Sequence, residues 1–124
     1  MKYYKLTDSN LKTQSETLWG VGVTHTATGK GHQLCSGDCI HVYDHPLKAA
    51  FFNPIHANFR SPILWECRVR AVKARDNTKV GVKTCTTIKQ IPLPEITTEQ
   101  RVRVAIYCAL VVYSDAKFVQ WANN

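Results

Sequence analysis

The strongest pattern in the chain is an alternation of apolar and polar residues along 63–73, which is typical of a β-strand with one buried side. One side carries Ile63, Trp65, Cys67, Val69 and Ala71, and the other carries Leu64, Glu66, Arg68 and Arg70. A polar connection at 76–78 leads to a second long β-prone segment at 79–91. The two segments predict an antiparallel hairpin whose exposed face brings together four basic residues, namely Arg68, Arg70, Lys79 and Lys83.

Shorter β-prone segments precede this hairpin at 2–6, 19–24 and 39–43, and the polar segment 8–18 predicts a loop. After the strand at 39–43, His45 and Pro46 predict the start of a short helix, because proline suits the first helical position. This helix is expected to stop near Asn53, because the residue before a proline is pushed out of the helical conformation. The N-terminal part therefore predicts an antiparallel or mixed sheet with one short helix.

The C-terminal part has a helical pattern. Residues 97–100 have the Ser/Thr-x-x-Glu/Gln spacing of a capping box, and apolar residues then recur at helical spacing along 98–113. A second short helix is predicted at 116–122. Strands first and helices last predict an α+β fold in a single domain, 1–124. Because the helix at 98–113 is apolar over most of its circumference, we expect the C-terminal helices to form a homodimer or to dock another protein.

The composition is that of an ordinary globular protein, with 124 residues of which 44% are hydrophobic. No apolar run approaches the roughly 18 residues that a membrane-spanning helix needs, so no membrane span is expected. No apolar stretch follows the N-terminal residues, so no secretory signal is expected. Five cysteines, an odd number spread along the chain, predict buried reduced thiols rather than a disulfide framework, in agreement with an intracellular setting.

The formal net charge of +7 is concentrated in one stretch. Residues 60–89 hold eight lysines and arginines against two acidic residues, and they include the predicted hairpin. Such a face could bind the phosphate backbone of a nucleic acid or an acidic protein. Trp65 is the only aromatic residue in this stretch, and it is expected to point inward, so base stacking is weakly supported.

Four residues have the side chains of zinc ligands at a spacing of C-x3-C-x-H-x3-H: Cys35, Cys39, His41 and His45. Cys39 and His41 would crowd a tetrahedral site from one side of a strand, so we expect a strand with a polar side rather than a metal centre. The sequence contains no Gly-x-Ser-x-Gly, papain-like, Walker or Rossmann motif. The residues taken alone therefore favour no particular reaction.

Several segments along nearly the whole chain resemble a family of small proteins of tailed bacteriophages and prophages. They are Tyr-Lys-Leu-Thr at 4–7, Trp-Gly-Val-Gly-Val-Thr-His at 19–25, His-Val-Tyr-Asp-His-Pro-Leu at 41–47, Asn-Pro-Ile-His-Ala-Asn-Phe at 53–59, Leu-Trp-Glu at 64–66 and Ile-Pro-Leu-Pro-Glu-Ile-Thr at 91–97. This resemblance implies an accessory protein that acts without catalysis in the host cytoplasm. Such a protein would bind a host factor during host takeover or would counter host defence.

A more distant resemblance concerns the fold. The first strand, the segment Ser36-Gly37 to Tyr43 and the short helix after it are similar to the opening of ADP-ribosyltransferase-like folds. This resemblance implies NAD as the cofactor, with Tyr43 in the middle position of a His-Tyr-Glu set and His41 beside it. Glu66 would fill the last position, for which Glu95 and Glu99 are alternatives. The first strand offers no His or Arg for the first position.

Overall fold

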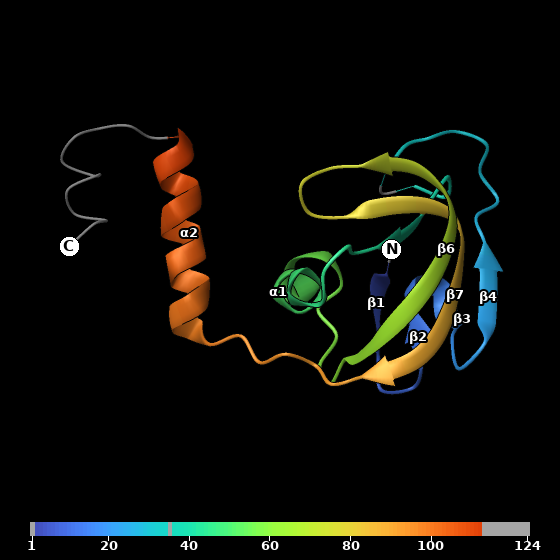
Figure 1. Ribbon diagram of the computed structural model, residues 1–124, viewed down its shortest axis with the longest axis horizontal. Helices are drawn as coiled ribbons and strands as arrows, with labels where there is room; N and C mark the ends of the chain where they lie inside the picture. The colour runs from blue at the N-terminus through green and yellow to red at the C-terminus, as the bar shows by residue number, and fades with distance from the viewer. Residues whose placement is uncertain (1, 35, 113–124) are drawn as a thin grey trace. The chain divides into compact units, whose positions relative to one another are not determined.

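Residues 2–34 and 36–112 are described by a computed structural model, in which the chain forms two compact units, 1–94 and 95–124 (Figure 1). The strands of the first unit are β1 (Tyr3–Thr7), β2 (Lys12–Thr13), β3 (Thr17–Leu18), β4 (Val23–Thr26), β5 (Ile40–Val42), β6 (Ile63–Arg75) and β7 (Val80–Ile91). Its helices are the 3-10 turn η1 (Gln14–Glu16) and α1 (Pro46–His56), and the described part of the second unit contains α2 (Thr98–Val112). The α+β class that the sequence predicts is confirmed.

The strands β6 and β7 form the long antiparallel hairpin that the alternation predicts. Their register shifts twice, between Glu66 and Cys67 and between Val72 and Ala74. Ala71, in the middle of β6, has a φ of 57°, which is a left-handed conformation. Such irregularities bend a strand and change which side its residues face. Ala71 is accordingly exposed, although the alternation placed it on the buried side.

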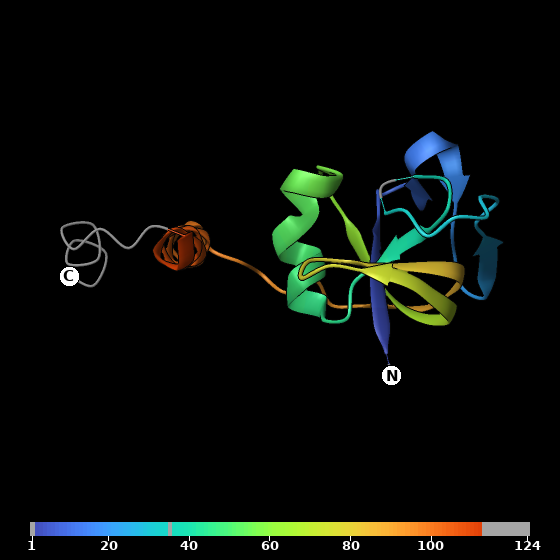
Figure 2. The same cartoon turned by 90° about the horizontal axis from the view of Figure 1, so that it is seen from above.

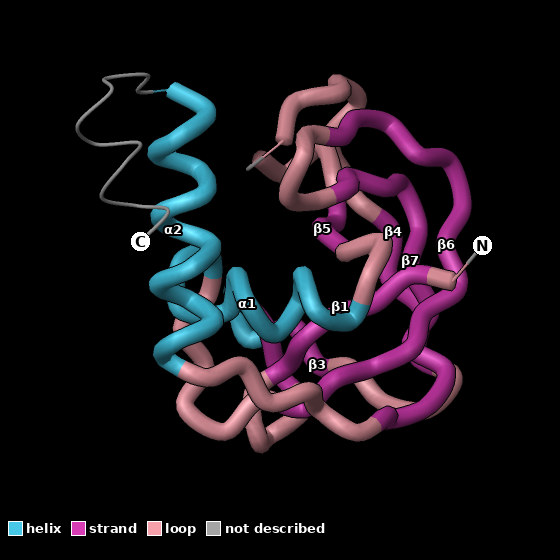
Figure 3. The backbone as a smooth tube through the Cα atoms, turned by 60° about the vertical axis from the view of Figure 1, so that its left-hand side comes forward, coloured by secondary structure: helices cyan, strands magenta, loops and turns pink. Residues whose placement is uncertain are grey.

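The main sheet is strongly curved, so that its first strand, β1, is joined to the end of β5. Its strand order is β1-β6-β7-β4, β5 also pairs with β7, and all of these pairings are antiparallel. Tyr4 and Tyr43 exchange two backbone hydrogen bonds, of 2.8 and 2.7 Å, which join β1 to the end of β5. The ring β1-β6-β7-β5 is thereby closed, and the curve of β6 and β7 around it is visible in Figure 3.

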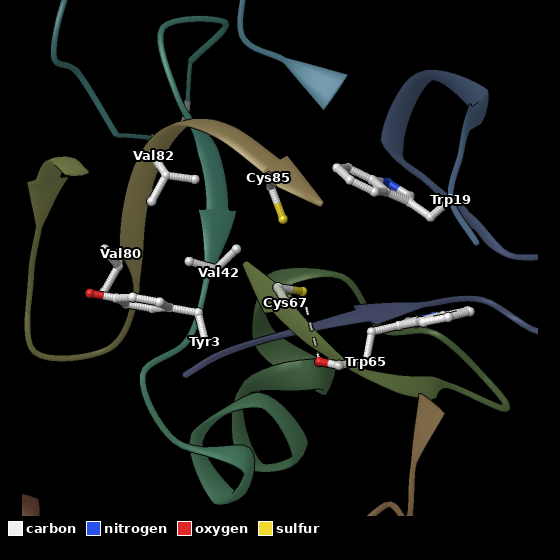
Figure 4. Packing of buried hydrophobic residues seen from close by; sticks show 8 residues of the cluster. All are labelled: Tyr3, Trp19, Val42, Trp65, Cys67, Val80, Val82 and Cys85. Carbon is white, nitrogen blue, oxygen red and sulfur yellow. Dashed lines mark hydrogen bonds between the residues drawn. The ribbon is translucent and has the colours of Figure 1, made fainter. Parts of the chain in front are cut away.

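The inner side of this ring holds the main hydrophobic core (Figure 4). The buried residues that pack together there are Tyr3, Trp19, Val42, Trp65, Cys67, Val80, Val82 and Cys85. Trp65 is 1% exposed, and its indole N–H donates to the buried hydroxyl of Thr7 at 3.0 Å. Three of the five cysteines, Cys39, Cys67 and Cys85, are buried free thiols, as predicted for them.

A second hydrophobic cluster lies where α1 packs beside β1 and β6 (Figure 2). Its buried members are Leu6, Tyr43, Ala49 and Leu64. The predicted start of α1 is confirmed, because the His45 ring accepts a hydrogen bond from the backbone N–H of Leu47 at 3.1 Å and Pro46 follows as the first helical residue. The predicted end near Asn53 is wrong, because α1 runs through Pro54 to His56.

Two further boundaries differ from the sequence prediction. The segment 8–18, predicted as a loop, contains the small antiparallel pair β2–β3 and η1. The strand predicted at 19–24 begins only at Val23, because Trp19 turns into the inner core and donates its indole N–H to Thr13 Oγ1 at 2.9 Å.

In the second unit, α2 starts with the predicted capping box. The backbone N–H of Thr97 donates to Gln100 Oε1 at 2.9 Å, and the backbone N–H of Gln100 donates to Thr97 Oγ1 at 3.1 Å. Val102, Val104 and Tyr107 on this helix are exposed within the structure. The helix predicted at 116–122 lies outside the described residues, and the homodimer stays a prediction. Within the described ranges, none of the helices has the length and apolar character needed to cross a membrane.

Candidate functional site

The outer side of the sheet, opposite the inner core, carries an open hollow of about 370 Å³. Six side chains from three neighbouring strands line it: Thr24, Thr26, Arg68, Arg70, Thr84 and Thr86. We refer to these six residues as the threonine–arginine surface. The strands that carry it, β4, β7 and β6, are neighbours in the sheet, and α1 packs beside β1 and β6 (Figure 1).

The register of the strands arranges the six residues in two identical rows. Thr24 on β4 is paired with Thr86 on β7, which is paired in turn with Arg68 on β6. In the second row Thr26 is paired with Thr84, and Thr84 is paired with Arg70. Each row therefore reads threonine, threonine, arginine, and the rows are two residues apart along every strand.

Local sequence preferences explain why threonines occupy these positions. Thr24 and Thr26 are the exposed residues of β4, and they alternate with the half-buried Val23 and His25. Threonine is β-branched and packs well on a pleated surface, and facing threonines form hydrogen bonds across strands. The hydroxyl oxygens of Thr24 and Thr86 are 2.7 Å apart and those of Thr26 and Thr84 are 3.3 Å apart, so each row is held by a cross-strand hydrogen bond.

Arg68 and Arg70 supply the charge of the surface. Both are exposed, and within residues 2–34 and 36–112 neither guanidinium group has an ion-pair or hydrogen-bond partner. The carboxylate of Glu66, two residues before Arg68 on the same strand, lies 3.2 Å from the ammonium group of Lys2. A guanidinium group presents its N–H donors in a planar fork that matches carboxylates and phosphates, so the two arginines are available to an anionic ligand.

Lys83, predicted to join the two arginines, lies elsewhere. Its ammonium group donates to the carbonyl oxygen of Ala27 at 2.6 Å and to that of Gly29 at 3.5 Å. Lys73 donates to the carbonyl oxygens of Gly29, at 3.4 Å, and Asp38, at 2.9 Å. The two lysines thus hold the loop between β4 and β5 against the hairpin. The predicted cluster of four basic residues is corrected to the two arginines, because the Lys83 ammonium group is bound to carbonyl oxygens of this loop and does not line the threonine–arginine surface.

Lys79, the fourth residue of the predicted cluster, lies at the turn of the hairpin, just before β7. The Asp76 carboxylate organises this turn by accepting hydrogen bonds from the backbone N–H of Lys79 at 2.8 Å and of Thr78 at 2.7 Å. These bonds stabilise the charged form and lower the pKa of Asp76 to about 2. Lys79 is not among the residues that line the threonine–arginine surface.

A second group of polar residues surrounds Tyr43. Its hydroxyl group is hydrogen-bonded to Nδ1 of His56 at 2.6 Å, and the Tyr43, Phe52 and His56 rings are nearly parallel, with interplanar angles from 3° to 11°. Burial, and to a smaller extent the charge of Asp76, raises the pKa of Tyr43 to about 12. A phenol with such a pKa stays protonated at neutral pH, so Tyr43 can donate a hydrogen bond but is a poor proton acceptor.

The other residues of the predicted His-Tyr-Glu set are placed as follows. His41 is half-buried on β5, and burial together with the charges of Lys79 and Lys5 lowers its pKa to about 4. Glu66 lies in the same row as Tyr43, since Tyr4 pairs with both of them. A row of this kind separates Glu66 and Tyr43 by two strand spacings, about 10 Å. Of the alternatives, Glu95 and Glu99 belong to the second unit.

The predicted zinc ligands are not all among the described residues, because Cys35 lies outside them. Cys39 is buried against Gly81, so closely that a Cβ atom at position 81 would lie 2.8 Å from the Cys39 sulfur. His45 is the N-cap residue of α1. Among the residues that the structure describes, no group of three or more His, Cys, Asp or Glu side chains is placed to hold a metal ion.

Sequence reasoning missed the four threonines of the threonine–arginine surface. The signal was present: threonines recur at every second position in 24–26 and in 84–86, as arginines do in 68–70. The sequence pattern does not predict that β4 pairs with β7, or in which register. This pairing joins segments that are about 60 positions apart in the sequence.

Comparison with protein families matches residues 1–99 to the family described as domain of unknown function DUF7666. The match covers most of the chain, which therefore belongs to this family. Neither the curated proteins nor the solved structures contain a match to the chain.

Proposed function

We propose that this DUF7666 protein is a non-catalytic accessory protein, encoded by a bacteriophage or prophage, that binds an anionic host factor through the threonine–arginine surface. The observation that carries the proposal is the pair of exposed arginines without a partner in the described part of the chain, set among four threonine hydroxyl groups. The resemblance to small proteins of tailed phages supplies the setting, the cytoplasm of the host.

The energetics favour binding through these residues. Arg68 and Arg70 are carried on paired strands rather than on a mobile loop, so little backbone ordering is needed when a ligand binds. The threonine hydroxyl groups both donate and accept hydrogen bonds, and their β-branched side chains have few conformations to lose. The surface can therefore contribute several hydrogen bonds to an anionic group at a small entropic cost.

The test is affinity capture from host lysate with three versions of the full chain: the wild type, Arg68→Glu/Arg70→Glu, and the matched control Arg60→Glu/Arg75→Glu. The control makes the same change of net charge at two exposed arginines outside the surface. We expect a host component that the wild type and the control retain and that the Arg68→Glu/Arg70→Glu variant loses. Equal capture by all three versions would contradict the proposal.

The alternative from the fold resemblance, an NAD-dependent ADP-ribosyltransferase, has its own test. Incubation of the protein and host lysate with labelled NAD is expected to transfer no label. Transfer of label by the wild type that is abolished in Tyr43→Phe, with unchanged thermal unfolding of the variant, would overturn the non-catalytic proposal.

A further inference from the structure

The two rows of the threonine–arginine surface have a repeat that identifies the kind of anion they fit. Each row has one guanidinium group and two hydroxyl groups on the same side of the sheet, and because the two hydroxyl groups are hydrogen-bonded to each other, one O–H donor per row remains available to a ligand. An arginine fork with adjacent hydroxyl donors is the combination that proteins use for phosphate oxygens. Because the rows are identical, the surface offers the same set of donors twice.

The distance between the rows follows from strand geometry. Two residues along an antiparallel strand span about 6.8 Å. Successive phosphates of a nucleic-acid strand, which are joined by a short run of single bonds, can match this spacing. Carboxylates on an acidic protein have this spacing only where acidic residues alternate along an extended strand, whereas a nucleic acid has it at every nucleotide. A polymer with one charge per repeating unit therefore fits two identical rows better than an acidic protein does.

The composition of the surface also indicates whether the base sequence of a bound nucleic acid would be recognised. None of its six residues is aromatic, so it offers no ring on which a base could stack. Contacts from threonine and arginine to phosphate oxygens fix the position of a nucleic-acid strand. They do not distinguish one base sequence from another. The net charge of +7 attracts polyanions over a longer range.

From these observations, and resting on the function proposed above, we infer that the host factor is a nucleic acid. Two successive phosphates of one strand would occupy the two rows, one on Arg68 with Thr24 and Thr86, the other on Arg70 with Thr26 and Thr84. The binding would be independent of sequence.

The test measures the affinity of the full chain for a mixed-sequence DNA duplex and for oligothymidine as a function of salt. Neutralising one phosphate contributes a slope of about −0.9 to the plot of log affinity against log salt for duplex DNA, and about −0.7 for a single strand. We expect Arg68→Gln/Arg70→Gln to flatten the duplex slope by about 1.8 and the single-strand slope by about 1.4 relative to the wild type. The control Arg60→Gln/Arg75→Gln, with the same loss of charge, should keep a slope closer to that of the wild type.

A threonine variant separates hydrogen bonding from charge. Thr24→Val/Thr86→Val removes the two hydroxyl groups of one row and keeps the side-chain shape and the net charge. We expect it to weaken binding a few-fold without a change in the salt slope. Thermal unfolding of every variant serves as the check on folding.

Three results would overturn the inference: no binding by the wild type at low salt, equal slopes for the wild type and Arg68→Gln/Arg70→Gln, or equal flattening in the two arginine variants. A nuclease-treated lysate distinguishes this failure from that of the proposed function. If a host component still depends on Arg68 and Arg70 after nuclease treatment, the partner is a protein, so the nucleic-acid inference is wrong and the proposed function stands. If nothing depends on the two arginines, both are wrong.

Discussion

Basic side chains of the β6–β7 hairpin have two different roles. Lys73 and Lys83 are half-buried and donate to carbonyl oxygens of the loop between β4 and β5. Lys5 is similar, since its ammonium group donates to the carbonyl oxygen of His41 at 2.8 Å and lies 5.4 Å from the centre of the Trp19 ring. Arg68 and Arg70, in contrast, project from the outer side into an open hollow.

This difference shows that a count of charges does not locate a binding surface. The lysines have flexible stems that reach across the fold and donate to carbonyl oxygens of distant segments. Their charge therefore contributes to the stability of the loop. The arginines contribute nothing comparable to the fold, so we expect their substitution to affect binding and leave stability nearly unchanged.

The largest effect on stability is expected for Lys83→Met, which keeps an unbranched stem of four heavy atoms and removes the ammonium group. The variant leaves the Ala27 carbonyl oxygen without this donor, and a hydrogen bond to a charged group contributes about 1.5–3 kcal/mol. We therefore expect the free energy of unfolding to fall by about 2 kcal/mol in urea denaturation. Arg75→Met, which removes an exposed charge near the end of β6, is the matched control. A loss no larger than that of the control would contradict the structural role of Lys83.

A smaller effect is expected from pH through His41. The unfolded histidine takes up a proton below about pH 6.5, whereas burial and neighbouring positive charges lower the pKa of His41 in the folded protein to about 4. Between these values the unfolded chain binds more protons, so stability is highest above pH 6.5 and falls as the pH drops toward 4. The full shift corresponds to roughly 3 kcal/mol, which solvent screening of this partly exposed ring reduces to about 1–2 kcal/mol.

Urea denaturation at a series of pH values checks this expectation, with His41→Gln as the variant. Burial also lowers the pKa of His56, which adds a loss in the same direction, so the variant should flatten the profile without making it level. An equally steep fall in the wild type and in His41→Gln would show that His41 is not the group responsible.

The smallest effect on stability is expected for Arg68→Ala/Arg70→Ala. Because both side chains are exposed and unpaired among the described residues, the free energy of unfolding should change by less than about 0.5 kcal/mol per substitution. Thermal and urea unfolding measure this directly. If the double substitution lowered the free energy of unfolding by more than about 2 kcal/mol, the arginines would stabilise the sheet. They would then not differ from the lysines in their contribution to stability.

Local patterns in the sequence were sufficient for much of the fold. The alternation at 63–73 predicts β6, the capping box at 97–100 predicts the start of α2, and His45 with Pro46 predicts the start of α1. Each of these signals lies within a few residues of the feature that it specifies. The end of α1 was misjudged because Pro54 removes only its own N–H donor, and the helix continues past it until the backbone N–H of Ala57 donates to the carbonyl oxygen of Asn53 at 3.0 Å.

The candidate site was less accessible from the sequence, because it depends on pairing between distant segments. Arg68 and Arg70 were identified from charge and alternation, and the structure places both on the outer side. Lys83 was assigned to the same group because alternation within each strand does not give the register, which pairs Arg70 with Thr84, or the reach of a lysine toward a loop. The threonines of β4 were missed because only the register with β7 places them next to the arginines.

The closed ring of strands also constrains the order in which the chain can fold. The β6–β7 hairpin joins neighbouring segments, whereas β1 pairs with β6, and β4 with β7, across about 60 intervening residues. Local contacts form early, and distant pairings wait for the entropy of loop closure to be overcome. The hairpin should therefore provide the template on which β1 and β4 dock. The Tyr4–Tyr43 bridge closes the ring only after β1 has docked, so the complete fold is expected to form in milliseconds to seconds, the range of proteins rich in distant strand pairings.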